Sequence, residues 1–200
     1  MNIKDNSKNV SSIVLGFSGR IKSGKSSVSY ELARALAWPR VAFGDHLRLL
    51  AIKQNLPETR ETLQELGAQM VEKDCRGFCM ELLKSINWKP GQHLIIDGIR
   101  HMSVLMTLRQ MVYPAVLKLV YLDADDEILE KRHQASPCGS LRSFVQIEKH
   151  STEKDVVIAL REAAELRVDS TKSIVETVGL IIAWLQNLNA EFLPEIRKPL

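Results

Sequence analysis

Residues 19–26 carry the side chains whose types and spacing point most directly to chemistry. They read Gly-Arg-Ile-Lys-Ser-Gly-Lys-Ser, which is the spacing of a phosphate-binding loop. Glycines at these positions let the backbone curl so that several N–H groups face one phosphate. Lys25 brings a mobile positive charge to the phosphate oxygens, and the Ser26 hydroxyl is a suitable ligand for Mg²⁺. We therefore predict that ATP with Mg²⁺ binds along the loop, at Gly19, Arg20, Ile21, Lys22, Ser23, Gly24, Lys25, Ser26 and Ser27.

The segments on both sides of this loop are the ones that such a mechanism needs. An apolar strand is expected over residues 13–17, and a helix is expected from about 24 to 37. The N-terminus of that helix would add the positive end of its dipole to the phosphate site. A strand, a glycine loop and a helix in this order argue against a chance pair of glycines. The apolar face of the helix is expected to consist of Val28, Leu32, Ala35 and Leu36.

A second candidate group lies at the end of another apolar run. Residues 93–97 read His-Leu-Ile-Ile-Asp and predict a strand that ends in a carboxylate. In P-loop proteins an acid at this place orients Mg²⁺ or one of its water molecules. Asp97 is therefore predicted to serve the metal together with Ser26, directly or through water. Because many strands end in aspartate, a simple turn cap before Gly98 remains the alternative.

The rest of the chain alternates β-branched apolar runs with helical patterns, which is typical of an α/β fold with a parallel sheet. Residues 45–88 contain no strand pattern, so we expect a helical insertion there. Asp45 is expected to cap its first helix and Pro57 to start the next. Further strands are expected at 40–43, 116–122 and 166–169, and further helices through Leu105 and Leu108, at 125–133, from 151 or 152 to 166, and at 171–188.

The bulk composition sets broad limits on the class of protein. Of the 200 residues 45% are apolar and 26% are charged, which is ordinary for a globular chain. We interpret residues 1–200 as a single domain with a loose lead-in, 1–11, and an extended tail, 189–200. The net charge of +3 is too small for a nucleic-acid footprint, so no nucleic-acid partner is expected.

The cysteines and the hydropathy pattern bear on location. Three cysteines, an odd and low number, argue against a disulfide framework and for a reducing compartment. Cys75 and Cys79 would share a helix face, and zinc would need Cys138, His133 or His150 in addition. No apolar stretch approaches the roughly 18 residues of a membrane span, and no secretory signal is visible. We expect a cytoplasmic protein without a membrane partner, and the sequence leaves its oligomeric state open.

Three further segments resemble the P-loop nucleoside and nucleotide kinases of the adenylate-kinase-like group. Asp97-Gly98-Ile99-Arg100 is similar to their Asp-Gly-x-x-Arg element, and Phe43 to Arg48 is similar to their acceptor-site turn and helix. Residues 60–67 resemble a segment of phage-type deoxynucleoside monophosphate kinases. The resemblance covers roughly 12–188. It implies a three-layer P-loop fold with a five-stranded parallel sheet, an acceptor-binding insertion at 45–88 and a short lid at 132–150.

The resemblance also implies roles for side chains outside the phosphate-binding loop. The acceptor would be bound by Asp45, Arg48, Arg60, Asp97 and Arg100. Arg132 and Arg142 would be lid arginines that stabilise transition-state charge, which makes them catalytic candidates with Lys25, Asp45 and Arg100. For a phosphate acceptor Asp45 only orients the ligand, whereas for a hydroxyl acceptor it could take the proton. The plain alternatives are solvated helix faces for the arginines and a helix cap for Asp45.

These patterns favour a kinase that transfers the γ-phosphoryl group of ATP to a small acceptor. A (deoxy)nucleoside monophosphate is preferred as the acceptor, and a hydroxyl acceptor such as dephospho-coenzyme A or a nucleoside is the second hypothesis. A regulatory ATPase or switch is the third, although it leaves the arginines at 48, 60 and 100 without a purpose. A GTPase is disfavoured because the sequence has no Asn-Lys-x-Asp motif for reading a guanine base.

Overall fold

The computed structural model describes residues 12–135 and 153–188. Within them five strands form one sheet in the order β2-β3-β1-β4-β5, and each neighbouring pair is parallel. The predicted α/β class with a five-stranded parallel sheet is therefore confirmed. The strands are β1 Ile13–Gly19, β2 Arg40–Ala42, β3 Leu94–Asp97, β4 Val116–Asp123 and β5 Leu166–Asp169.

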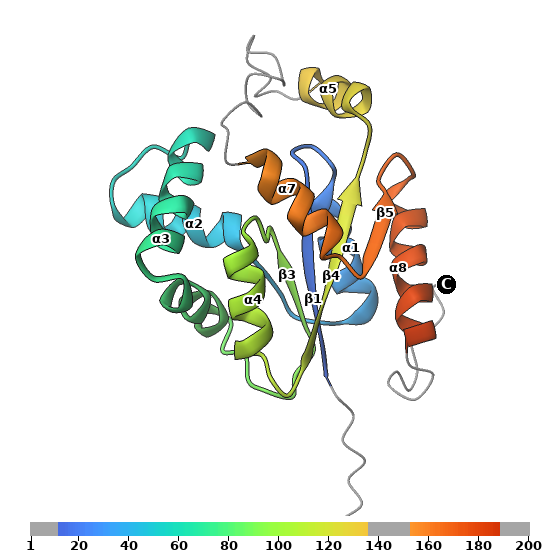
Figure 1. Ribbon diagram of the computed structural model, residues 1–200, viewed down its shortest axis with the longest axis horizontal. Helices are drawn as coiled ribbons and strands as arrows, with labels where there is room; N and C mark the ends of the chain where they lie inside the picture. The colour runs from blue at the N-terminus through green and yellow to red at the C-terminus, as the bar shows by residue number, and fades with distance from the viewer. Residues whose placement is uncertain (1–11, 136–152, 189–200) are drawn as a thin grey trace, which may run out of the picture.

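Helices cover both faces of this sheet (Figure 1). The helix after the phosphate-binding loop, α1, and the last helix, α8, pack against each other on one face. On the other face α4 lies between α3 and α7. The helices are α1 Lys25–Leu36, α2 Phe43–Lys53, α3 Arg60–Ser85, α4 Met102–Met111, α5 Asp126–Gln134, α7 Glu153–Glu162 and α8 Ile174–Leu188.

Alternation along the strands divides the apolar residues between two cores. In β1, Val14 faces the layer of α3, α4 and α7, whereas Leu15 and Phe17 face the layer of α1 and α8. In β4, Leu119 and Val120 divide in the same way. A strand buried on both faces reads as a continuous apolar run, which is why β1, β3 and β4 stand out in the sequence.

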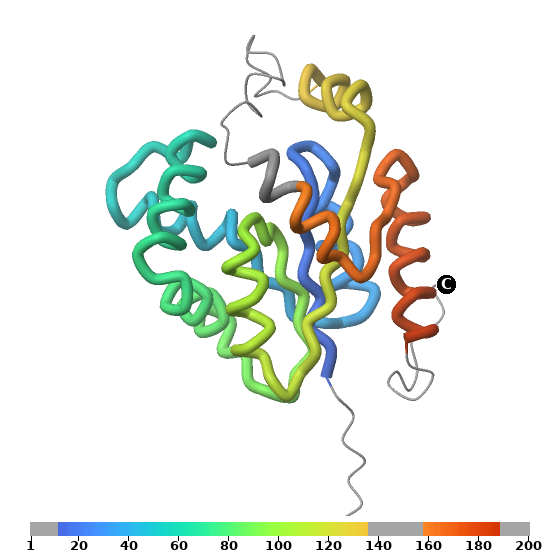
Figure 2. Tube along the Cα trace, in the orientation of Figure 1, coloured from blue at the N-terminus to red at the C-terminus, as the bar shows by residue number. Residues whose placement is uncertain are grey.

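Two helices separate β2 from β3, as the lack of a strand pattern in this segment predicted. They lie beside the sheet on the left of Figure 2. Their predicted starts were wrong. The first helix begins at Phe43 after Ala42, so Asp45 lies inside its first turn and does not cap it. The second begins at Arg60, because the Thr59 side chain accepts a hydrogen bond from the Thr62 N–H and caps the helix after Pro57.

The apolar face of α1 was also predicted too broadly. Val28 and Leu32 of α1 are buried, but Ala35 is exposed. In α8, Val178, Ile181 and Leu185 are buried, whereas Ile174, the first residue of the helix, is 42% exposed. None of the helices within 12–135 and 153–188 combines the length and apolar character that a bilayer crossing requires.

Candidate active site

The phosphate-binding loop lies at the carboxyl end of β1, in the middle of the sheet. Gly19, Lys22 and Gly24 all have positive φ, at 140°, 62° and 84°, so the chain reverses sharply between β1 and α1. Lys25 is the first residue of α1. The backbone N–H groups of this turn and of the first helical turn have no partner inside the helix, which is the basis of an anion site at a helix N-terminus. The strand, loop and helix predicted for residues 13–37 are thus present.

The Lys25 side chain is held against the phosphate-binding loop by hydrogen bonds to the loop backbone. Its side chain is buried, and Nζ donates hydrogen bonds to the carbonyl oxygens of Gly19 and Arg20, each at 2.7 Å. The ammonium group therefore lies within the curl of the loop, where phosphate oxygens would compete for the same donors. Ser26 and Ser27 follow in the first turn of α1 and are exposed. Both hydroxyl groups are accessible to a ligand on the outer side of the loop.

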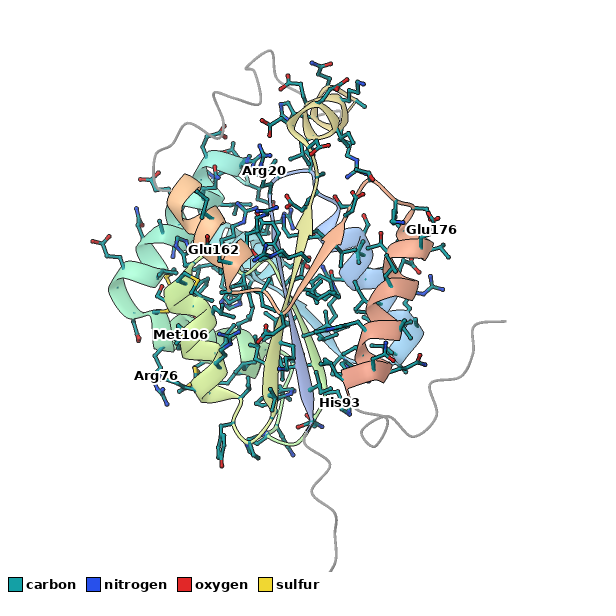
Figure 3. All side chains as sticks on the ribbon, turned by 45° about the vertical axis from the view of Figure 1, so that its right-hand side comes forward. Arg20, Arg76, His93, Met106, Glu162 and Glu176 are labelled. Carbon is teal, nitrogen blue, oxygen red and sulfur yellow. The ribbon has the colours of Figure 1, made fainter. Side chains whose placement is uncertain are left out.

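Helix α5 braces the other side of this loop. Ile21 packs in a small apolar cluster with Ala124 and Leu129, and Arg20 forms an ion pair with Asp126 at the start of α5. In Figure 3 Arg20 lies near the upper end of the sheet, on the side where α5 stands. The exposed position of Asp126 and the partial exposure of Arg20 make this a surface contact that steadies the loop.

Asp97 ends β3 beside the loop and is buried. The strand pairing sets Asp97 opposite Phe17 on one side and Ala42 on the other. Its Oδ2 atom accepts a 2.6 Å hydrogen bond from Arg40 Nη2. Its Oδ1 atom is buried and has no hydrogen-bond partner among the described residues. A buried carboxylate oxygen of this kind is suited to the hydration shell of Mg²⁺, which keeps several water ligands in proteins.

Arg40 is a site residue that the sequence reading missed. It is the first residue of β2, and besides Asp97 it contacts Ser29 Oγ through Nε at 2.9 Å. Its Nη1 atom lies 3.8 Å from Asp45 Oδ2. A basic residue at the start of a short strand has no local signal of function. Arg40 and Asp97 lie on adjacent paired strands, but their separation along the chain conceals this in the sequence.

The predicted acceptor residues divide into a connected group and two separate arginines. Asp45 and Arg48 form a 2.7 Å ion pair on α2, beside a hollow of about 170 Å³ that Arg40 also lines. Arg100 is exposed in the turn after β3. Next to it, burial and then the Arg100 charge lower the pKa of His101. Arg60 is half-buried at the start of α3.

Of the two predicted lid arginines, Arg142 lies outside the described residues. Arg132 lies near the end of α5 and donates hydrogen bonds to the Ser170 carbonyl at 2.6 Å and the Lys22 carbonyl at 3.4 Å. It therefore joins the phosphate-binding loop to the segment after β5. That contact places a guanidinium group at the border of the phosphate site.

Two of the three cysteines lie within the described part of the chain. Cys79 is buried, and burial raises the pKa of its thiol to about 12. Cys75 is half-buried with its sulfur 3.5 Å from Thr107 Oγ1. Within residues 12–135 and 158–188 no group of three or more cysteine, histidine or acidic side chains has a metal-binding arrangement. Cys138 and His150 lie outside the described part of the chain.

Comparison with known proteins shows the family of this chain. A family model described as an AAA domain matches residues 15–153, from within β1 through α5 and beyond. The chain belongs to this AAA-domain family. A curated relative, a UPF0200 protein of Pyrobaculum aerophilum, is 26% identical over 167 residues, which cover 82% of this chain and 91% of the relative.

Similar solved structures establish that the AAA-domain chain has the fold of P-loop kinases. A gluconokinase from Sinorhizobium meliloti 1021 is similar with a TM-score of 0.51 and 20% identity, covering 89% of this chain and 93% of that one. Shikimate kinase from Aquifex aeolicus is similar with a TM-score of 0.52 and 21% identity, covering 88% and 97%. A sugar kinase from Janibacter sp. HTCC2649 has a TM-score of 0.55 at 15% identity, covering 88% and 95%. The resemblance to P-loop kinases inferred from the sequence is confirmed at the level of the fold.

Proposed function

We propose that this protein transfers the γ-phosphoryl group of ATP to a small acceptor, and that the acceptor is a (deoxy)nucleoside monophosphate. One observation supports this proposal most directly. The phosphate-binding loop and the Asp45–Arg48 pair lie at the same end of the sheet. Arg40 contacts both Asp97, which lies beside the loop, and Asp45. Phosphoryl transfer needs two anionic groups held in line and their charge neutralised more than it needs covalent chemistry.

The chain's own residues divide this work. The loop backbone and Lys25 would hold the β- and γ-phosphates of ATP, with the Lys25 ammonium leaving the carbonyls of Gly19 and Arg20 for phosphate oxygens. Ser26 and Asp97 would hold Mg²⁺, and the ion when bound neutralises phosphate charge. Arg48 and Arg100 would bind the acceptor phosphate through charge-assisted hydrogen bonds. Arg132, which donates a hydrogen bond to the Lys22 carbonyl, would stabilise charge that develops during transfer.

Asp45 bears on the choice between phosphate and hydroxyl acceptors. One carboxylate oxygen is bonded to Arg48, and the other faces Arg40. A carboxylate between two guanidinium groups is well placed to orient arginines toward an anionic acceptor. This supports the nucleotide reading over a hydroxyl acceptor that would need Asp45 as its base. The second candidate is nevertheless a hydroxyl acceptor, because the similar structures include kinases named for gluconate and shikimate.

The test is an ADP-release screen of the full chain with MgATP against nucleoside monophosphates, nucleosides, dephospho-coenzyme A, gluconate and shikimate. We expect stimulation by a nucleoside monophosphate. Lys25→Ala should lower that rate by about 100-fold or more, because it removes a cation that stabilises transferred charge. The control is Lys84→Ala, which changes an exposed lysine in the last turn of α3 outside the loop and should retain most of the activity.

A second step tests the nature of the acceptor. Arg100→Ala should raise the KM of a phosphate acceptor about tenfold, the usual worth of a charge-assisted hydrogen bond. The KM of ATP should stay the same. Stimulation by nucleosides or hydroxy acids alone would replace the nucleotide reading with the hydroxyl one. ATP hydrolysis that no acceptor changes would support a regulatory ATPase instead.

A further inference from the structure

Arg40 contacts side chains from three different elements of the site. Its Nη2 atom donates to Asp97 Oδ2 at 2.6 Å, its Nε atom donates to Ser29 Oγ at 2.9 Å, and its Nη1 atom lies 3.8 Å from Asp45 Oδ2. We propose that Arg40 is a positioning residue that fixes the Asp97 carboxylate for Mg²⁺ and ties it to the acceptor helix α2. The inference rests on the proposed function, because it assigns Asp97 to the metal of an ATP site.

The geometry at Asp97 gives Arg40 this role. The guanidinium group occupies one carboxylate oxygen, Oδ2, and leaves the buried Oδ1 without a hydrogen-bond partner among the described residues. The side chain of Asp97 is 4% exposed, so water alone cannot compensate its charge. A planar guanidinium bonded to one oxygen fixes the plane of the carboxylate. Oδ1 therefore keeps a constant direction, which is what the support of a metal ligand sphere requires.

The contact with Ser29 fixes the position of the Arg40 guanidinium group relative to the phosphate-binding loop. Ser29 belongs to α1, the helix that begins with Lys25 and Ser26. Its hydroxyl group accepts from Arg40 Nε and donates to the Ser26 carbonyl at 3.1 Å. Arg40 thus connects the helix that carries one proposed metal ligand, Ser26, with the strand that carries the other, Asp97. A lysine would keep the charge but could not maintain the three contacts at once.

Arg40 also lines two hollows, one beside the phosphate-binding loop and one beside the acceptor helix α2. It lines a hollow of about 490 Å³ with Ser26 and Ser27, and it lines the hollow of about 170 Å³ beside Asp45. With Arg48 it completes a row of alternating charges from Asp97 through Arg40 and Asp45 to Arg48. A shift of the Asp97 carboxylate would therefore also displace Asp45 and Arg48 on the acceptor helix α2.

The competing explanation is that Arg40 only neutralises a buried carboxylate and supports stability. The two explanations differ in what they predict for Mg²⁺. A purely structural cation affects the free energy of unfolding and leaves the magnesium dependence of nucleotide binding unchanged in protein that is folded. A positioning residue changes the magnesium dependence even where the protein remains folded.

The experiment measures binding of a non-hydrolysable ATP analogue to the full chain by calorimetry, without Mg²⁺ and over a series of Mg²⁺ concentrations. Three variants are compared. Arg40→Gln loses the charge and the planar guanidinium group, and Arg40→Lys keeps the charge. Ser29→Ala loses the Arg40 Nε contact together with the hydrogen bond from Ser29 to the Ser26 carbonyl. The matched control is Arg34→Gln, because Arg34 forms an exposed ion pair with Glu31 on the outer face of α1. Circular dichroism establishes that each variant is folded.

Arg40→Gln should bind the analogue without Mg²⁺ about as well as the natural chain, because the loop and Lys25 are intact. Its Mg²⁺ requirement should rise about 10- to 100-fold, the usual effect of removing a residue that orients a metal ligand. Arg40→Lys should recover part of this loss, and Ser29→Ala should show a smaller change in the same direction. With the preferred acceptor, kcat should fall and the acceptor KM should rise, because Arg40 also contacts Asp45 beside the acceptor hollow. Arg34→Gln should match the natural chain.

An unchanged Mg²⁺ requirement in folded Arg40→Gln would overturn the proposal, and so would full recovery by Arg40→Lys. If Arg40→Gln does not fold, unchanged magnesium dependence in both Arg40→Lys and Ser29→Ala would overturn it. Failure of the proposed function has a different signature. In that case the natural chain itself would bind the analogue without any effect of Mg²⁺, or would not bind it.

Discussion

Gly19 lies where β1 turns into the phosphate-binding loop, and the backbone leaves no space there for a side chain. Its φ is 140°, a value that other residues rarely adopt. A Cβ atom added at this position would lie 2.4 Å from the Leu122 carbonyl oxygen of the adjacent strand β4. That contact is with backbone, so it cannot be relieved by turning a flexible side chain. The close approach of two strands therefore fixes the residue type at the first position of the motif.

We predict that Gly19→Ala is destabilising by about 1–3 kcal/mol, from backbone strain and the displacement of β4. It should also weaken binding of the ATP analogue, because the loop begins at this residue. Urea unfolding and calorimetry provide the two measurements. The matched control is Gly179→Ala, where a Cβ meets nothing within 4 Å on an exposed face of α8. There alanine should stabilise the helix by up to about 1 kcal/mol. Equal stability of the two variants would contradict the steric explanation.

Side chains with local signals were recoverable from the sequence, and those that act through distant partners were not. The phosphate-binding loop is one continuous segment, so its residues could be named in advance. Arg40 is separated from Asp97 by 57 positions and follows a Pro in an ordinary strand, so only the fold brings the two together. Asp45 showed the opposite problem. Its position before an apolar stripe suggested a helix cap, but the helix begins two residues earlier because β2 runs directly into it.

Among the elements, α3 consists of two helical pieces joined at Asp74. That residue has φ −159° and ψ 82°, which are not helical values. Its Oδ1 atom accepts a 2.8 Å hydrogen bond from the Gly77 N–H. This is the contact of an N-cap, so the second piece of α3 starts as an independent helix that packs Phe78, Cys79 and Leu82 into the core.

Asp74→Ala should therefore lower the free energy of unfolding by about 1 kcal/mol, the usual cost of losing a cap. Glu72→Ala serves as the control, because Glu72 is exposed within the first helical piece and alanine suits a helix interior. The midpoint of urea unfolding should fall for the first variant and stay level or rise for the second. If both variants unfold at the same urea concentration, Asp74 does not act as a cap.

The elements were easier to predict than their ends. Strands buried on both faces have long apolar runs, whereas the fifth strand, Leu166–Asp169, has one buried residue and a weaker signal. The start of α3 was missed because Pro57 is a common first-turn residue, whereas Thr59 makes the actual cap. The bend at Asp74 was missed for another reason. Apolar residues on both sides of it keep a helical spacing, and spacing does not record a change of axis.

At the scale of the whole molecule, His93 joins the amino ends of β1 and β3, at the end of the sheet opposite the site. The N–H of Ile13 donates to His93 Nδ1 at 3.0 Å, and the ring stacks on Trp38 at 4.3 Å. In Figure 3 His93 lies at the opposite end of the sheet from Arg20. Burial lowers the pKa of His93 below its ordinary value of 6.5. A change of its charge should thus act on stability and leave nucleotide binding alone.

The sign of the pH effect follows from that direction. Near pH 6 and below, the unfolded chain binds a proton at His93 that the folded chain resists, so the free energy of unfolding falls as the pH falls through 6.5. Above that pH the stability is fully present. Urea unfolding at pH 7.5, 6.5 and 5.5 should show this decline, and His93→Gln should make it shallower. His101, whose pKa burial also lowers, should keep part of the slope. An identical slope in His93→Gln would exclude His93 as a source.

The position of β1 in the sheet also bears on how the protein is made. β1 is hydrogen-bonded on one side to residues 94–97 and on the other to residues 116–122. During synthesis the ribosome releases the phosphate-binding loop before both neighbours of its strand, β3 and β4. Until then the nascent chain presents an apolar strand with two open edges, the kind of segment that chaperones cover. The phosphate-binding loop can thus bind ATP only after the later strands β3 and β4 have joined the sheet.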